Sequence, residues 1–282
     1  MSQFDDISLF CEDEPNGPTI RLLAIAVQSL RREVRIATLV EPLPAGGKSD
    51  VKVRVRHARV DQKHVRAGQR RAFGIRDRDF LSRKLLDVQR ERALLTDAKA
   101  AEAWPLSRHC IESYLLEPSF LVSVLGQAEA EWNEMLEGLA AERRWLDLGR
   151  AVLNDARWRA SNSRWPKLSK LISTRGEAVA AISAQCAEML KDATEALDEK
   201  AAFKKFDELD QDFTVDGPLA TRVDGKELLN AVGARLREEG REPKGGLGPA
   251  LLAHADRDGC PALLVGEVRE LLLGIQGALG IV

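Results

Sequence analysis

Short apolar segments alternate with amphipathic ones in the N-terminal part of this chain, and this alternation constrains the fold more than any other feature. Residues 7–11 and 72–75 are apolar runs that predict buried strands, and residues 34–40, which are rich in β-branched side chains, predict another. Between them, residues 19–30 and 49–68 have the apolar spacing or the end signals of helices. Strands that alternate with helices form parallel sheets. The sequence therefore predicts an α/β fold built on a parallel βαβ core.

Two further regions of the sequence are predicted to be helical. Val51, Val53 and Val55 alternate like a strand, but two parallel strands need a crossover connection, which favours a helix between them. Beyond residue 81 the apolar spacing is mostly helical, and residues 263–279 predict an apolar helix that packs on the core or on a second copy. The expected architecture is thus a parallel sheet followed by a mainly helical part.

Carboxylates follow two of the predicted strands at their C-terminal ends. Glu12 comes directly after residues 7–11, and Asp77 and Asp79 come after residues 72–75. Because parallel strands end at the same edge of a sheet, these acids are expected to lie close together. Mg²⁺ is held in proteins by carboxylate oxygens, substrate phosphates and water. The pattern favours a divalent-metal site, and solvated loop charges are the alternative.

The formal net charge of −2 hides a strong asymmetry along the chain. Residues 21–92 hold 19 Lys and Arg against 8 Asp and Glu, whereas the remainder holds 23 against 36. A basic region beside a metal site favours binding of a nucleic acid through its phosphates. The alternative is that the basic and acidic parts complement each other within the fold or a dimer. The candidate phosphate contacts are Lys48, Lys52, Arg56 and Arg78.

The composition excludes several classes of protein. With 282 residues, of which 44% are apolar and 30% charged, the chain can bury a substantial core. No run approaches the roughly 18 apolar residues of a membrane span, and the first residues are acidic where a signal peptide is basic. The four cysteines are far apart in the sequence, which predicts reduced thiols rather than disulfides or a zinc knuckle. We therefore expect a cytoplasmic protein.

Residues 42–49 end in Gly-Lys-Ser between a predicted strand and a predicted helix, where a phosphate-binding loop would lie. Pro42 replaces the first glycine of that motif, and proline supplies no backbone N–H. The segment therefore predicts a glycine loop in which Lys48 is a single phosphate contact. A nucleotide hydrolase that depends on Lys48 and Ser49 is the alternative.

Five short segments, taken in order, resemble a Toprim family related to the OLD nucleases. The likeness covers roughly residues 7 to 230, and the order of its motifs makes it more specific than any one of them. Members of that family occur with ABC- or AAA-type ATPases in phage-defence systems such as PARIS. The segments are residues 9–14, Gly46-Gly47-Lys48, residues 74–80, residues 111–118 and Asp224-Gly225-Lys226.

The resemblance implies a role for each matching acid and for one lysine. Glu12 would be a metal ligand or a general base, and Asp77 and Asp79 would be metal ligands. Glu112 would bind a second metal ion, and Lys226 would stabilise the transition state. The implied cofactor is Mg²⁺ or Mn²⁺, and the implied activity is endonucleolytic hydrolysis of DNA or RNA, tRNA included.

Two positions depart from the family's pattern. Toprim domains usually have glycine after the first glutamate, where this chain has Asp13, and OLD-type nucleases have an acid where it has Asn16. These departures leave open a site with one metal ion, a site completed by Glu14, or a non-catalytic subunit that binds or scaffolds nucleic acid.

The resemblance also implies an organisation and a set of partners. Residues 1–120 would form the first part of a Toprim core, residues 121–210 a helical insertion, and residues 211–282 a segment that completes the core. We expect an effector of anti-phage defence that is controlled by a separate ATPase and is able to form a homodimer.

Overall fold

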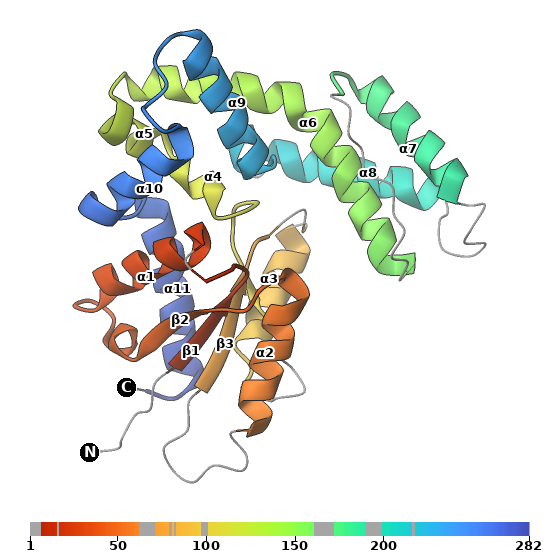
Figure 1. Cartoon of the computed structure of the whole chain (residues 1–282). Helices are drawn as coiled ribbons and strands as arrows, with labels where there is room; N and C mark the ends of the chain where they lie inside the picture. The colour runs from red at the N-terminus through yellow and green to blue at the C-terminus, as the bar shows by residue number, and fades with distance from the viewer. Residues whose placement is uncertain are drawn as a thin grey trace.

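A parallel sheet of four strands forms the centre of the N-terminal part of the chain (Figure 1). The computed structural model describes residues 7–15, 17–61, 71–78, 81, 83–96, 101–160, 172–189, 199–215 and 218–281. All three neighbouring pairs of strands in the order β2-β1-β3-β4 are parallel, which confirms the predicted α/β fold. The strands are β1 (Ile7–Cys11), β2 (Val40–Pro44), β3 (Arg71–Arg76) and β4 (Trp104–Pro105).

The strand predicted at residues 34–40 is wrong in position, because β2 begins only at Val40. Residues Arg35–Thr38 form a short 3₁₀ helix, η1, in which Ile36 is buried in the core without strand pairing. Strand β2 is difficult to predict from the sequence because it contains Pro42 and a second proline. Proline has no backbone N–H to donate to a neighbouring strand. Both are accommodated because β2 lies at the edge of the sheet and pairs only with β1.

Helices cover both faces of the sheet. Helices α1 (Pro18–Leu30) and α11 (Ala262–Ala278) pack together on one side of the sheet (Figure 1). Leu9 and Phe73 belong to the same core cluster as the buried residues of these two helices. Helix α2 (Lys48–Asp61) packs on the opposite face, over Phe10. These two layers bury the strands on both sides, as is usual for parallel sheets.

Helix α2 confirms the prediction of a helix over the alternating valines. Val51 and Val55 are fully buried, whereas Val53 is 46% exposed, which is helical and not strand spacing. The helix lies so close to β3 that a Cβ atom at Gly74 would be 2.8 Å from the Val51 side chain. The helix ends at Asp61, and the predicted end near residue 68 lies outside the described residues.

The remainder is largely helical, as predicted, and one cluster of buried side chains extends from β1 to α11. The long helix α6 packs against α5, α7, α8 and α9, and Figure 1 shows α7 and α8 far from the sheet. The 3₁₀ helix η4 (Leu219–Thr221) leads into α9. The other helices are α3 (Arg83–Ala93), α4 (Glu112–Leu115), α5 (Pro118–Leu125), α6 (Glu129–Ala160), α7 (Arg175–Met189), α8 (Glu199–Val215), α9 (Gly225–Glu238) and α10 (Leu247–Asp258).

Candidate functional site

Two of the predicted acids follow the C-terminal ends of neighbouring parallel strands. Glu12 comes directly after β1, and Asp77 comes directly after β3. In the register of this pair, Cys11 lies opposite Ile75, so the two strands end at the same edge of the sheet. Glu12 lies within electrostatic range of the Asp77 carboxyl group. Asp79 lies outside the described residues.

A third predicted acid reaches the same edge from α4. Glu112 is the first residue of this one-turn helix and is only 8% exposed. The backbone N–H of Ile111 donates a hydrogen bond of 3.2 Å to Oδ1 of Asp77, which ties the start of α4 to the end of β3. This contact places the Glu112 carboxylate near Asp77, more than 30 residues away in the sequence.

Lys226 approaches the acids from α9. Its Nζ lies 3.6 Å from Oε1 of Glu112. Asp224 caps the helix by accepting the backbone N–H groups of Lys226 and Glu227, at 3.1 and 3.3 Å. A Cβ atom on Gly225 would come within 2.8 Å of the backbone nitrogen of Ser113 in α4, so this contact requires glycine.

The neighbouring charges change the affinity of Asp77 and of Lys226 for protons. Burial, together with the negative charges of Glu12 and Glu112, raises the pKa of Asp77 to about 7, against the opposing effects of Lys226 and the Ile111 N–H. Burial lowers the pKa of Lys226, but the carboxylates of Glu112 and Asp77 outweigh it and raise this pKa above its ordinary value. The site therefore concentrates negative charge that a further cation would stabilise.

The donor set fits a hard divalent cation. Glu112 Oε2 is buried and has no nitrogen or hydroxyl partner among the residues that the structure describes, and the thiol of Cys110 is the neighbour that meets this carboxylate. A buried carboxylate oxygen without a partner is costly, and a metal ion is one group that satisfies it. Carboxylate oxygens from Glu12, Asp77 and Glu112 are the ligand type that Mg²⁺ and Mn²⁺ prefer.

The helical remainder supports this site through a buried acid that sequence reasoning missed. Asp147 of α6 is fully buried and accepts the backbone N–H of Asp224 at 3.0 Å. It also lies 3.4 Å from Arg150 and 3.7 Å from Arg143. Burial raises the pKa of Asp147 to about 6. No local sequence signal links it to Asp224, because the contact joins residues 77 positions apart.

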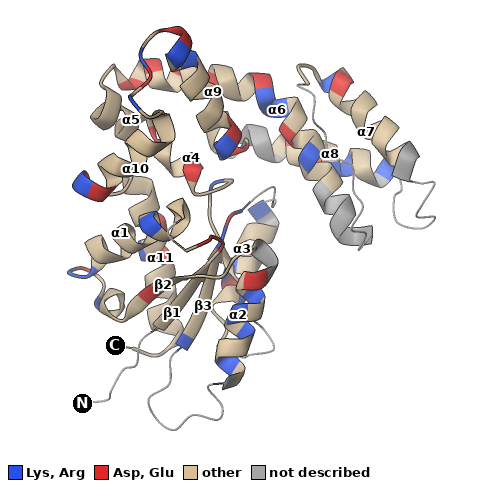
Figure 2. Ribbon diagram, viewed as in Figure 1, with Lys and Arg blue, Asp and Glu red and all other residues tan. Residues whose placement is uncertain are grey.

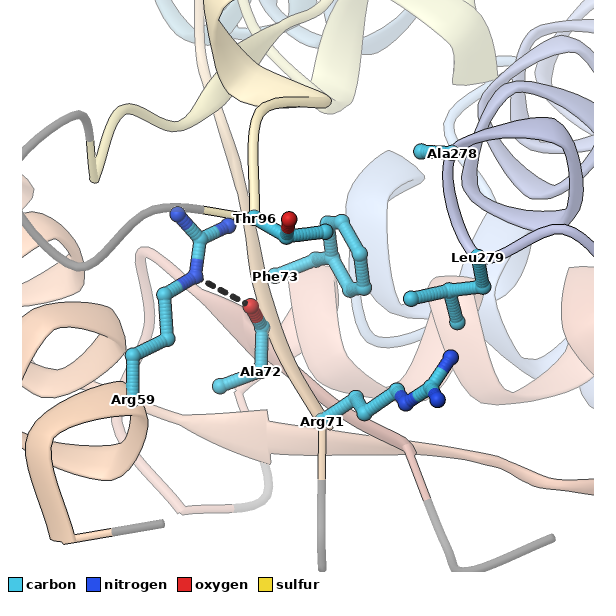
Figure 3. Close-up of a pocket in the computed structure, with 7 residues that line it drawn as sticks. All are labelled: Arg59, Arg71, Ala72, Phe73, Thr96, Ala278 and Leu279. Atoms are coloured by element: carbon cyan, nitrogen blue, oxygen red, sulfur yellow. Dashed lines mark hydrogen bonds between the residues drawn. The ribbon is translucent and has the colours of Figure 1, made fainter. Parts of the chain in front are cut away.

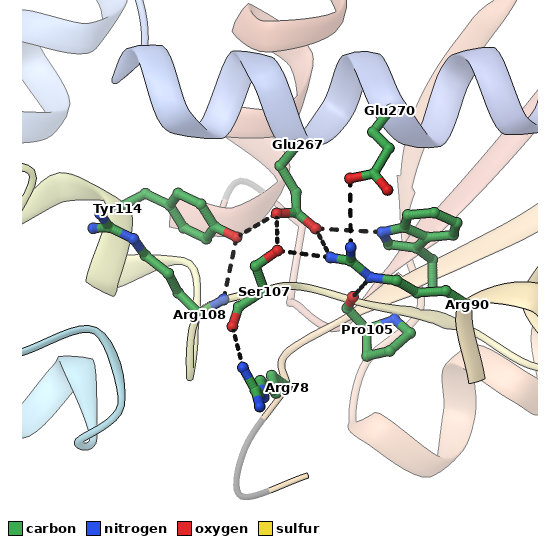
Figure 4. A network of polar contacts seen from close by, with 9 residues as sticks. Arg78, Arg90, Pro105, Ser107, Arg108, Tyr114, Glu267 and Glu270 are labelled. Carbon is green, nitrogen blue, oxygen red and sulfur yellow. Dashed lines mark hydrogen bonds and ion pairs between the residues drawn. The ribbon is translucent and has the colours of Figure 1, made fainter. Parts of the chain in front are cut away.

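A buried polar network, also absent from the sequence analysis, holds the segment between β4 and α4 (Figure 4). Glu267 of α11 accepts hydrogen bonds from Arg90 and Ser107, and from the Tyr114 hydroxyl at 3.2 Å. The Arg90 guanidinium also lies over the Trp104 ring, 4.7 Å from its centroid. The network fixes the position of α4 relative to β4 and α11.

Asp13 has a structural role at the position where the resemblance leads one to expect glycine. Its carboxylate accepts the backbone N–H groups of Glu14 and Thr19, both at 2.8 Å, and so caps the start of α1. A Cβ atom at Gly17 would collide with this carboxylate. Asn16, the other departure, lies outside the described residues.

The four predicted phosphate contacts differ in their surroundings. Arg78 is 5% exposed and donates to the carbonyl oxygens of Leu81 and Ser107, at 2.9 and 2.8 Å, so its guanidinium serves the fold. Lys52 forms an ion pair with Glu102. Arg56 is exposed on α2, where Figure 2 shows several Lys and Arg residues, and the side chain of Lys48 is not described.

Three backbone amides in the loop between β2 and α2 donate hydrogen bonds to acceptors within the protein. The backbone N–H of Ala45 donates to Cys11 O at 2.9 Å, and that of Gly46 donates to Asp13 O at 3.1 Å. The N–H of Gly47 donates to the Asp50 carboxylate at 3.1 Å. Because protein acceptors use all three amides, they cannot cradle a nucleotide without rearrangement.

A pocket of about 330 Å³ lies beside the start of β3, away from the acids (Figure 3). The Arg59 side chain borders it and donates to Ala72 O at 3.0 Å. None of the acids discussed above lines this pocket, so it forms no part of the site. Its lining residues are Arg59, Arg71, Ala72, Phe73, Thr96, Ala278 and Leu279.

Comparison with protein-family models, curated protein sequences and solved structures found no match to this chain. Within the described residues, no helix combines the length and the hydrophobicity needed to cross a membrane.

Proposed function

We propose that this chain is a Mg²⁺-dependent nuclease of the Toprim type that hydrolyses phosphodiester bonds in DNA or RNA. The observation that carries the proposal is the convergence of Glu12, Asp77 and Glu112 with Lys226, from four separate segments, at one edge of a parallel sheet. Buried structural ion pairs normally balance their charges, whereas this cluster concentrates carboxylates around a group with a pKa near 7.

In this proposal the acidic residues would bind the metal ion, and the lysine would stabilise the charge that develops on the phosphate. Asp77 and Glu112 would hold the metal ion, and Glu12 would serve as a further ligand or as the base that accepts a proton from the attacking water. A bound divalent cation polarises the scissile phosphate and activates water for attack. Lys226, with a side chain 62% exposed, is able to move from Glu112 toward a phosphate and offset its developing charge.

The basic side chains exposed on α2 support a polyanionic substrate. Arg54 and Arg56 are exposed, and α2 covers one face of the sheet that carries the acids. The electrostatic part of this binding would weaken as salt concentration rises. The same feature supports a second candidate function, a non-catalytic subunit that binds nucleic acid.

Control by a separate ATPase is part of the proposal. Because the amides of residues 45–47 already bond to protein acceptors, we assign nucleotide hydrolysis to a partner chain of the ABC or AAA type. The corresponding prediction is that the purified chain alone binds no ATP in an equilibrium titration.

The test incubates the purified chain with plasmid DNA and, separately, with total tRNA, in Mg²⁺ or Mn²⁺. We expect metal-dependent cleavage that is lost in the Glu12→Gln Asp77→Asn double variant and kept in Glu41→Gln, which alters an exposed acid on β2. If neither substrate is cleaved, even with the partner ATPase and its trigger added, the nuclease proposal is wrong. Salt-sensitive binding without cleavage would then identify the non-catalytic subunit.

A further inference from the structure

A second cluster of metal-ligating side chains lies beside the acids and has a different chemical character. One side-chain ligand atom from each of His109, Cys110 and Asp224 lies within 4.8 Å of the others. His109 is 7% exposed and Cys110 is 2% exposed. The cluster joins the segment before α4 to the N-cap residue of α9, more than 100 residues away in the sequence.

Local contacts arrange these side chains before any ion arrives. Both capping hydrogen bonds of Asp224 go to Oδ1, and its Oδ2 accepts none from the residues that the structure describes. Gly225 allows the close approach, because a Cβ atom there would be 2.8 Å from the Cys110 sulfur. The N–H of Asp224 is held in turn by the buried carboxylate of Asp147. Asp224 is therefore held by Asp147 on one side, and Gly225 packs against Cys110 on the other.

We propose that His109, Cys110 and Asp224 bind one Zn²⁺ ion, which holds the first turn of α9 against the segment that precedes α4. Zn²⁺ is bound by thiolate sulfur, imidazole nitrogen and carboxylate oxygen, whereas Mg²⁺ takes oxygen ligands. Three protein ligands leave one tetrahedral position for water. The ligand types thus separate this ion from the Mg²⁺ proposed for Glu12, Asp77 and Glu112, and the inference does not depend on nuclease activity.

The first experiment uses Co²⁺ as a spectroscopic substitute for Zn²⁺. The full chain is stripped with a chelator, placed in excess Mg²⁺ to occupy oxygen sites, and titrated with Co²⁺. We expect one equivalent to produce a thiolate-to-cobalt charge-transfer band. Cys110→Ser should lose this band. The matched control Cys260→Ser should keep it, because the Cys260 thiol donates to Leu22 O in α1 and is not part of the cluster.

Competition with Zn²⁺ then measures affinity. Loss of an outer partner of a metal ligand already costs about 10- to 100-fold in affinity, so loss of the Cys110 thiolate should exceed roughly 100-fold. Asp224→Asn, which keeps an oxygen to cap α9, should also weaken binding. Zn²⁺ should raise the melting temperature of the original chain but not that of Cys110→Ser, each compared with its own melting temperature without metal.

Three outcomes would overturn the proposal. The band could be absent from the original chain, it could survive Cys110→Ser, or Zn²⁺ could bind both chains equally. The Glu12→Gln Asp77→Asn double variant separates the two metal sites: it should keep the cobalt band, and its loss there would place the ion at the acids. A chain that shows the band but cleaves neither plasmid DNA nor tRNA, even with the partner ATPase and its trigger added, would support the zinc site and refute the nuclease proposal.

Discussion

Replacing Asp77 with asparagine should stabilise the metal-free protein at neutral and alkaline pH. Asp77 is surrounded by the charges of Glu12 and Glu112, and its pKa is about 7 in the folded protein. The asparagine has the same shape, and its Oδ1 is still able to accept the N–H of Ile111. The substitution therefore removes a charge that the fold disfavours and keeps the hydrogen bond that the fold uses.

The sign and size of the effect follow from proton linkage. An unfolded aspartate loses its proton near pH 4, whereas folded Asp77 keeps it until about pH 7. Between these values the folded state binds more protons, so the free energy of unfolding falls as pH rises. The pKa of Asp77 in the folded protein exceeds that in the unfolded protein by roughly three, which corresponds to about 4 kcal/mol at most. Structural relaxation and access of water reduce the expected change in the free energy of unfolding to about 2 kcal/mol.

The assay is urea denaturation of the chelator-treated protein at pH 5 and pH 8. Asp77→Asn should gain about 2 kcal/mol on the original chain as the pH rises, most of it above pH 5. Asp87→Asn, at an exposed position on α3, should leave the pH dependence unchanged. Adding Mg²⁺ at pH 8 should stabilise the original chain more than Asp77→Asn. A stability difference between the two chains that is the same at both pH values would refute the reasoning.

Substitutions at three other residues test the packing of α9 and the role of its lysine. Gly225→Ala should cost about 2 kcal/mol in urea denaturation because its Cβ overlaps α4, whereas Gly266→Ala, which meets no atom within 4 Å, should cost nothing. Asp147→Ala should cost about 3 kcal/mol by thermal denaturation, and Asp147→Asn less, because the amide still accepts the N–H of Asp224. Lys226→Met should tighten Mg²⁺ binding in calorimetry, because the ammonium group of Lys226 repels the ion. The same substitution should slow cleavage, because Lys226 would stabilise the charge that develops on the phosphate. Weaker Mg²⁺ binding by this variant would contradict the prediction.

The parts of the fold that were predictable are those fixed by local periodicity. The apolar runs of β1 and β3 are buried on both faces, and the acids that follow them occupy the shared edge because the strands are parallel. Helix α2 shows the limit of this reasoning. Its valines fit both a strand and a helix, and only the need for a crossover between parallel strands selected the helix.

The parts that were not predictable depend on contacts between distant segments. Strand β2 contains two prolines, and its edge position, which tolerates them, is a property of the whole sheet. Arg78 was predicted to contact phosphate because it belongs to the basic region of the sequence and lies beside the predicted metal ligands. In the fold its guanidinium donates to backbone carbonyls, one of them Ser107 O, so a charge count overestimates the basic surface. Glu267 and Asp147 acquire their partners only through tertiary packing.

The position of Lys226 on a separate helix has a consequence for how the proposed site works. The side chain of Glu112 is 11% exposed and that of Lys226 is 62% exposed, and their charged atoms are 3.6 Å apart, beyond a strong hydrogen bond. The carboxylate is thus fixed, whereas the ammonium group is free to move. A divalent cation bound to Glu112 would repel Lys226, because two cations would then lie beside the same carboxylate. Metal binding would therefore displace the Lys226 ammonium group toward solvent, from which the phosphate of the substrate approaches. The positive charge of Lys226 would thus stabilise the carboxylates in the metal-free site and the phosphate once the metal ion is bound.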